Sequence, residues 1–161
     1  MLDAVLFDLD GTLADTAPDL CGTMNILLSE EGRPQQPFSR LRPHTSGGVR
    51  GLLGEGFGIE PADPDYARLA ARFLEIYAGR LCELSTLFDG IPALLDTLES
   101  RGIAWGIVTN KRARFTDPLV EALGLGRRTL CVVSGDTTAE AKPSPLAILH
   151  ACTLLGQAPQ R

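Results

Sequence analysis

The chain has 161 residues and a formal net charge of −5 at pH 7, with 44% hydrophobic and 22% charged residues. These values are typical of one ordinary globular domain, and they exclude a disordered tail, a collagen-like repeat and a coiled coil. The basic residues are scattered, which predicts no nucleic-acid partner, and no apolar run approaches the roughly 20 residues of a membrane helix, which predicts no membrane partner.

Three short apolar runs predict buried strands, at residues 4–8, 103–109 and 129–133. Helical stretches are expected at 91–100 and 115–123, closed by Gly102 and Gly124, and a further helix at about 145–155. This alternation of strands and helices indicates an α/β fold, a Rossmann-like parallel sheet covered by helices.

Residues 15–84 differ from the rest, because they show helical spacing and no strong strand. One apolar stripe comprises Leu20, Met24, Leu27 and Leu28, and another comprises Leu69, Phe73, Ile76 and Tyr77. Between the two stripes we expect a Gly- and Pro-rich connector from 32 to 64. The sequence therefore predicts an α/β core made of 1–14 and 85–161, interrupted by a helical domain at 15–84.

The first candidate for chemistry follows the first strand, where residues 8–12 read Asp-Leu-Asp-Gly-Thr. On extended backbone Asp8 and Asp10 point the same way, toward the carboxyl end of the strand, where open α/β sheets bind ligands. Two carboxylates so close repel each other unless a cation intervenes, most simply Mg²⁺. The alternative is an ordinary turn with two solvated carboxylates.

Two further candidates also follow predicted strands. Thr109 and Asn110 could hold a phosphate through a hydroxyl and backbone N–H groups, or could simply cap a helix. Lys142 lies between Ala141 and Pro143, and the chain has only one other lysine, Lys111, against 13 arginines. A compact ammonium suits a crowded carboxylate–phosphate site, although a surface lysine is the plain alternative. Because each candidate follows a parallel strand, all should open on one edge of the sheet.

Together, residues 5–13, 107–110 and 141–145 resemble the first three motifs of the haloacid dehalogenase-like superfamily of phosphotransferases, in the same order and spacing. The helical block at 15–84 stands where that family inserts its small cap. The second acidic residue, Asp10, favours a leaving alcohol over a halide, and therefore a phosphatase or a phosphomutase.

The resemblance implies a role for each matching residue. Asp8 would be the nucleophile that forms an aspartyl-phosphate, and Asp10 the general acid and base, with Asp8 and Asp10 also binding Mg²⁺ as cofactor. Thr109 and Lys142 are the other expected catalytic residues: Thr109 would hold a phosphoryl oxygen, and Lys142 would balance charge between nucleophile and phosphate. The expected phosphate-binding residues are Gly11, Thr12, Thr109, Asn110 and Lys142.

Within the superfamily, the chain resembles the phosphoglycolate phosphatase branch, close to enzymes that hydrolyse N-acetylmuramic acid 6-phosphate. Residues 45–50 and 87–92 carry this similarity. It implies a small acidic phosphorylated metabolite as partner, with Arg50 available for a carboxylate. The expected substrate-binding residues of the cap are Ser46, Gly47, Gly48 and Arg50, for which a flexible turn is the alternative, and His44 is expected to be a surface or capping residue.

The family's fourth motif, with a further Asp for the metal, should follow the helix at 145–155, where this sequence ends. We do not assign that role to Asp136, which precedes Lys142 and fits a turn or N-cap. A chain ending at 161 would leave the strand of Asp8 with an unpaired edge open to self-association, and it would bind Mg²⁺ weakly or act as a non-catalytic fragment. Four separated cysteines and an N-terminus without a secretory signal predict a reduced, cytoplasmic protein.

Overall fold

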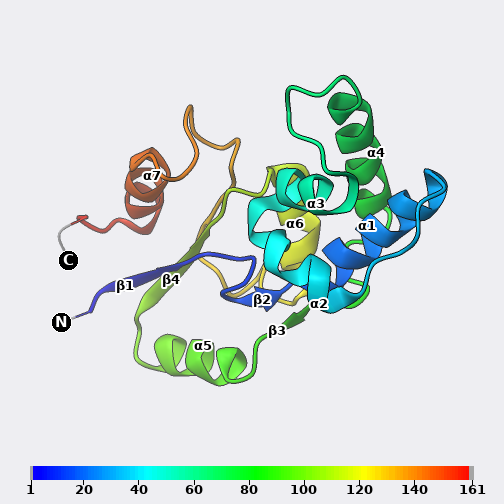
Figure 1. The fold of residues 1–161 in the computed structure, drawn as a ribbon. Helices are drawn as coiled ribbons and strands as arrows, with labels where there is room; N and C mark the ends of the chain where they lie inside the picture. Colours follow the sequence, from blue (N-terminus) through cyan, green and yellow to red (C-terminus); the bar gives the residue numbers. More distant parts are fainter. Residues whose placement is uncertain (1, 160–161) are drawn as a thin grey trace. The chain divides into compact units, whose positions relative to one another are not determined.

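The computed structural model describes residues 2–159, and it contains two compact units (Figure 1). Unit 1 comprises Met1–Asp15 and Thr86–Arg161, and unit 2 comprises Thr16–Ser85. The helical domain expected at 15–84 differs from unit 2 by one residue at each end. Each unit is described separately below.

Unit 1 is built on a parallel sheet with the strand order β1-β4-β5. β1 (Ala4–Phe7) pairs with β4 (Ala104–Val108), and β4 pairs with β5 (Val132–Val133). β5 is shorter than the expected strand at 129–133, because the N–H of Thr129 still closes a turn on the carbonyl of Leu125. Within the described residues β1 forms one edge of the sheet, and self-association through that edge stays a prediction.

Three helices of unit 1 follow the expected pattern, and the parallel α/β fold is confirmed. They are α5 (Ile91–Ser100), α6 (Ala113–Ala122) and α7 (Leu146–Leu155). The sequence did not predict a short antiparallel pair, β2 (Ala14–Asp15) with β3 (Thr86–Leu87), which joins the segments where the chain leaves and re-enters unit 1. Among the described residues, no helix combines the length and the apolar character needed to cross a membrane.

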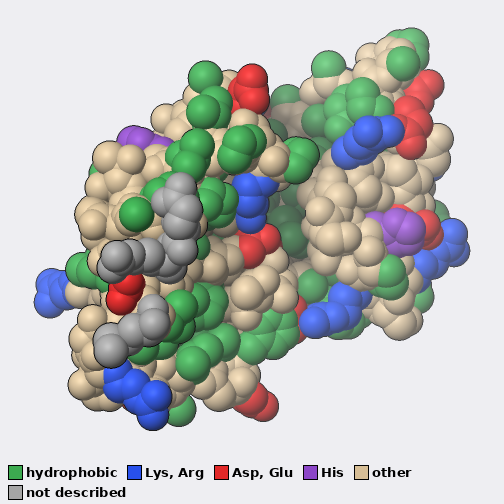
Figure 2. Space-filling model, turned by 90° about the vertical axis from the view of Figure 1, so that its left-hand side faces the viewer, with side chains coloured by type: hydrophobic (Ala, Val, Ile, Leu, Met, Phe, Trp, Pro, Cys, Tyr) green, Lys and Arg blue, Asp and Glu red, His purple; other side chains and the backbone are tan. Residues whose placement is uncertain are grey.

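The helix α7 packs against the sheet and also carries apolar side chains on its outer side. Its inner side forms a buried cluster with the ends of β4 and β5, comprising Val108, Cys131, Val133, Ala147 and Ala151. Its exposed apolar residues are Leu146, Ile148, Leu149 and Leu154. Figure 2 shows hydrophobic side chains in several groups on one face of the molecule.

Unit 2 is a helical domain whose core is formed by the two predicted apolar stripes. Its elements are α1 (Ala17–Glu30), α2 (Phe38–Leu41), a 3₁₀ helix (Arg42–Gly47), α3 (Gly48–Phe57) and α4 (Tyr66–Ala78). The residues of both stripes are buried except Ile76, which is half-buried. Leu52 and Leu53 of α3 complete this core.

The expectation of a Gly- and Pro-rich connector at 32–64 is wrong for most of that segment, because the segment contains α2, the 3₁₀ helix and α3. Glycines lower helix propensity, but here they permit close packing. A Cβ at Gly56 would lie 2.1 Å from Cε of Met24, and one at Gly51 would lie 2.3 Å from the carbonyl oxygen of His44. Tertiary contacts therefore stabilise a helix that its composition does not favour.

A buried carboxylate ties the two ends of unit 2 together. Asp19 in the first turn of α1 is 0% exposed. It accepts hydrogen bonds from the backbone N–H groups of Leu84 and Ser85 and from the hydroxyl of Ser85. These bonds replace the water that the charge loses on burial.

The contacts of α3 predict opposite effects for two Gly→Ala substitutions in the same helix. Gly51→Ala should lower the free energy of unfolding by about 1–3 kcal/mol, because the new methyl group meets backbone that cannot move aside. Gly54→Ala, whose nearest new neighbour lies 3.9 Å away, should raise it by up to about 1 kcal/mol through helix propensity. Urea unfolding measures both, and similar effects at the two positions would contradict this account.

Candidate active site

Charged and polar side chains gather at the carboxyl edge of the sheet in unit 1. Asp8 directly follows β1 and Thr109 directly follows β4. Parallel strands end at the same edge, so the turn after β1 and the loop after β4 lie together. The loop that leads from β5 to α7 adds Lys142 to this edge.

Asp8 and Lys142 form an ion pair, with 3.1 Å between Oδ1 and Nζ. Nζ of Lys142 also donates a hydrogen bond to the carbonyl of Val108 at 2.8 Å. Oδ1 of Asp8 accepts a second hydrogen bond from the N–H of Leu9 at 2.8 Å. The carboxylate is therefore held through one oxygen, and its side chain remains 45% exposed.

Asp10 pairs with the other lysine of the chain. The distance from its Oδ1 to Nζ of Lys111 is 3.1 Å, and the lysine side chain is only 10% exposed. We did not predict Lys111 as a site residue, although its rarity and its place in a strand-exit loop were visible in the sequence. The structure thus brings two carboxylates and two ammonium groups to one sheet edge.

The turn after Asp10 depends on glycine. Gly11 has a φ of +77°, a conformation that side chains disfavour, and its N–H donates to the carbonyl of Ala14 at 2.9 Å. Both Gly11 and Thr12, two predicted phosphate-binding residues, are exposed in this turn.

Thr109 and Asn110 occupy the loop after β4, as predicted, but their side chains act differently. The buried hydroxyl of Thr109 accepts the N–H of Lys111 at 3.2 Å, which leaves its own proton for another acceptor. The side-chain amide of Asn110 instead contacts the backbone of Lys142 through two hydrogen bonds of 2.9 Å. Sequence reasoning missed this interaction of Asn110 with Lys142, because the partners are 32 residues apart.

The loop after β5 is fixed to the loop after β4. A Cβ at Gly135 would lie 2.2 Å from the carbonyl oxygen of Asn110, so only glycine allows this approach. Oδ1 of Asp136 accepts the N–H of Ala113, the first residue of α6, at 2.8 Å. Asp136 thus caps a helix of another segment, which accords with the cap role expected for it.

The predicted substrate-binding residues of the cap lie where the 3₁₀ helix meets α3 in unit 2. Ser46 and Gly47 are exposed, and Gly48 has a φ of +58°. Arg50 is not free, because Nε and Nη2 bind Oε2 of Glu60 at 3.0 and 2.9 Å. His44 pairs with Glu55 and stays largely at the surface, the position expected for it.

The oxygen donors at the sheet edge fit a hard divalent cation. Asp8 keeps its Oδ2 without a hydrogen-bond partner among the described residues, and the backbone carbonyl of Asp10 is two residues away. The described part of the chain has no group of three or more His, Cys, Asp and Glu side chains able to hold a metal. A divalent cation bound to so few protein oxygens would retain several waters and could also bind substrate oxygens.

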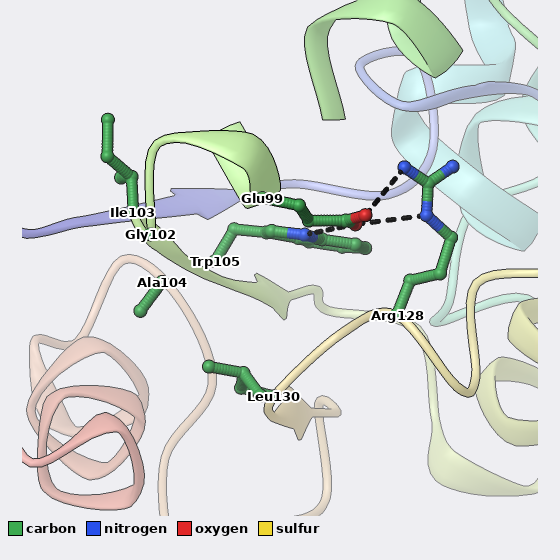
Figure 3. Close-up of a pocket in the computed structure, with 7 residues that line it drawn as sticks. All are labelled: Glu99, Gly102, Ile103, Ala104, Trp105, Arg128 and Leu130. Carbon is green, nitrogen blue, oxygen red and sulfur yellow. Dashed lines mark hydrogen bonds and ion pairs between the residues drawn. The ribbon is translucent and has the colours of Figure 1, made fainter. Parts of the chain in front are cut away.

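A pocket of about 260 Å³ lies at the opposite, amino end of β4 (Figure 3). Oε1 of Glu99 accepts Nε1–H of Trp105 and Nε–H of Arg128, both at 3.0 Å, and Arg128 also pairs with Asp96 at 2.6 Å. These polar groups satisfy one another, and none of the predicted site residues lines the pocket. We interpret it as structural.

The parallel α/β fold and the charges paired at its carboxyl edge are those expected of a phosphoryl-transfer enzyme. Residues 5–161 match the family of haloacid dehalogenase-like hydrolases, and the chain belongs to that family. It is 40% identical over 160 residues to N-acetylmuramic acid 6-phosphate phosphatase of Pseudomonas aeruginosa, covering 99% of this chain and 71% of the relative.

Two further comparisons agree with this assignment. A phosphoglycolate phosphatase of Xanthomonas campestris pv. campestris is 43% identical over 155 residues, covering 96% of this chain and 70% of the relative. The crystal structure of a predicted phosphoglycolate phosphatase from Haemophilus somnus 129PT has a TM-score of 0.82 and 25% identity, covering 99% of this chain and 74% of that one. The chain is therefore a phosphoric monoester hydrolase by family, as predicted.

The hydrogen bonds that Glu99 accepts from Trp105 and Arg128 in this pocket predict a pH-dependent contribution to stability. The hydrogen bond from Arg128, with help from Trp105 and against partial desolvation, lowers the pKa of Glu99 below its ordinary value. This stabilisation should be complete above the usual glutamate pKa and disappear as the pH falls through the lowered pKa of the folded state.

The measurement compares wild type with Glu99→Gln. At pH 7 the melting temperature of Glu99→Gln should be a few degrees lower than that of wild type. This difference should become smaller as the pH is lowered. Trp105 is the sole tryptophan, so its fluorescence reports the same titration. Asp117→Asn, at an exposed position, serves as control. A pH-independent difference would contradict the assignment.

Proposed function

We propose that the chain is a Mg²⁺-dependent phosphatase of small acidic phosphomonoesters that works through an aspartyl-phosphate on Asp8. The observation that supports it most is the neutral cluster of two carboxylates and two lysines at the sheet edge. A phosphomonoester brings a charge of about −1.5 to −2 at neutral pH. A divalent cation balances that charge, and it would be held by Asp8 and the carbonyl of Asp10.

The residues divide the reaction into two displacements. An oxygen of Asp8 attacks phosphorus while the bond to the ester oxygen breaks, and Asp10 gives a proton to the departing alkoxide. Asp10 then takes a proton from water as that water attacks phosphorus, which releases inorganic phosphate and regenerates Asp8. Thr109, the N–H of Asn110, and Lys142 stabilise the phosphoryl oxygens through electrostatic contacts, while bound Mg²⁺ supplies charge neutralisation.

The acidic substrate is proposed from the relatives and from Arg50. The relatives are named for phosphoglycolate and N-acetylmuramic acid 6-phosphate, and both compounds contain a carboxylate. Arg50 donates two hydrogen bonds to the carboxylate of Glu60, and this supports a role for its guanidinium in binding a substrate carboxylate. We infer that a substrate carboxylate exchanges with Glu60.

The first test is the nucleophile. Asp8→Asn should reduce Mg²⁺-supported hydrolysis of p-nitrophenyl phosphate to the level of the enzyme-free blank, because an amide cannot form the acyl phosphate. Asp10→Asn should reduce hydrolysis of alkyl phosphates by about 10²–10⁴-fold. Chelation should abolish the wild-type rate and Mg²⁺ should restore it. Asp117→Asn is the matched control, and an active Asp8→Asn protein would exclude the proposal.

The second test separates substrate recognition from chemistry. Arg50→Gln should raise KM for carboxylate-bearing substrates roughly 10- to 100-fold, the value of a charge-assisted hydrogen bond, and leave p-nitrophenyl phosphate unchanged. Glu60→Gln removes the competing carboxylate and should lower KM for the same acidic substrates. If Arg50→Gln affects both substrate types equally, Arg50 does not recognise the carboxylate.

A further inference from the structure

The side chain of Asn110 pairs with the backbone of Lys142 in both directions. Nδ2–H of Asn110 donates to the carbonyl of Lys142, and Oδ1 accepts the N–H of Lys142, both at 2.9 Å. The amide thus uses a donor and an acceptor on one residue, in the way that neighbouring strands do. An aspartate would lose the donor and an alanine would lose both.

These bonds hold the part of the chain from which the site lysine extends. Lys142 lies in the loop between β5 and α7. From Thr137 to Ser144, all within the described residues, the remaining backbone hydrogen bonds join residues of the same loop. The hydrogen bonds that join this part of the loop to other segments are those between the Lys142 backbone and Asn110 and the one that Nζ of Lys142 donates.

Both the ammonium group and the backbone of Lys142 are held by residues that lie close together at the end of β4. Its Nζ binds the carbonyl of Val108, and its backbone binds the side chain of Asn110, two residues further along. Between them stands Thr109, which is proposed to hold a phosphoryl oxygen. The same turn of chain therefore determines where the phosphoryl group and the ammonium lie relative to each other.

We propose that Asn110 is a positioning residue: its side-chain amide holds the backbone of Lys142 so that the ammonium stays between Asp8 and the phosphoryl group. This inference rests on the proposed function for its catalytic consequence, but its structural part does not. The role is separate from the phosphate contact expected of the Asn110 N–H, which every substitution at this position retains.

The presence of only two lysines allows a direct test. Limited acetylation followed by mass spectrometry gives the ratio of modification at Lys142 to modification at Lys111, which serves as an internal reference. In Asn110→Ala the ratio should rise about tenfold, because the freed loop lets the ammonium leave its partners. Asn110→Asp should give a smaller rise. Thr138→Ala removes a hydrogen bond within the same loop and should leave the ratio unchanged.

Kinetics and amide exchange complete the experiment. For p-nitrophenyl phosphate, Asn110→Ala should lower kcat roughly tenfold with KM within about twofold, whereas Thr138→Ala should lower neither. Hydrogen exchange at the Lys142 amide should be fast in Asn110→Ala, and it should stay slow in wild type and in Asn110→Asp, which keeps the oxygen that accepts this N–H.

The outcomes separate the two proposals. An unchanged acetylation ratio in both Asn110 variants, together with unchanged amide exchange in Asn110→Ala, would overturn the positioning role, whatever the activity. A raised ratio with full kcat would overturn its catalytic part. A raised ratio in a protein whose wild type hydrolyses no phosphate ester would support the structural tie and reject the proposed function instead. Should Asn110→Ala fail to fold, Asn110→Asp and wild-type amide exchange still decide the question.

Discussion

The arrangement of the loops at the carboxyl edge of the sheet depends on two carboxylates that the chain places two residues apart at the end of β1. The negative charges of Asp8 and Asp10 repel each other unless positive charge lies close by. Each has a lysine, and the two lysines come from different loops. Charge compensation therefore also connects the exits of the strands, and the chain's only two lysines are both used for it.

Those loops are also held by contacts other than the two ion pairs, and these contacts give the charged groups a defined position. The amide of Asn110 binds the Lys142 backbone, and the absence of a side chain at Gly135 lets the loop after β5 approach the carbonyl of Asn110. Asp136 adds a helix cap between segments. A site that relied on ion pairs alone would tolerate several arrangements, because surface ion pairs are weak and long side chains are flexible.

The sequence predicted the parts of the fold that depend on local pattern. Apolar runs located the strands, and the motifs after them located Asp8, Thr109 and Lys142. It could not predict α3, whose glycines disfavour a helix until Met24 and the His44 carbonyl pack against them. Nor could it predict the hydrogen bonds between Asn110 and Lys142, because local sequence pattern does not show which side chain will bind a backbone group 32 residues away.

The two ends of β4 show why one edge of the sheet is suited to chemistry and the other is not. At the amino end, Glu99, Trp105 and Arg128 satisfy one another, so a ligand would have to break existing bonds. At the carboxyl end, the Thr109 hydroxyl proton and Oδ2 of Asp8 remain unengaged within the described residues. A buried polar group without a partner is costly, which applies to the Thr109 hydroxyl, whereas the Asp8 side chain is 45% exposed and open to a ligand. The phosphoryl group and the cation of the proposed function would supply an acceptor for the hydroxyl and a charge for the carboxylate.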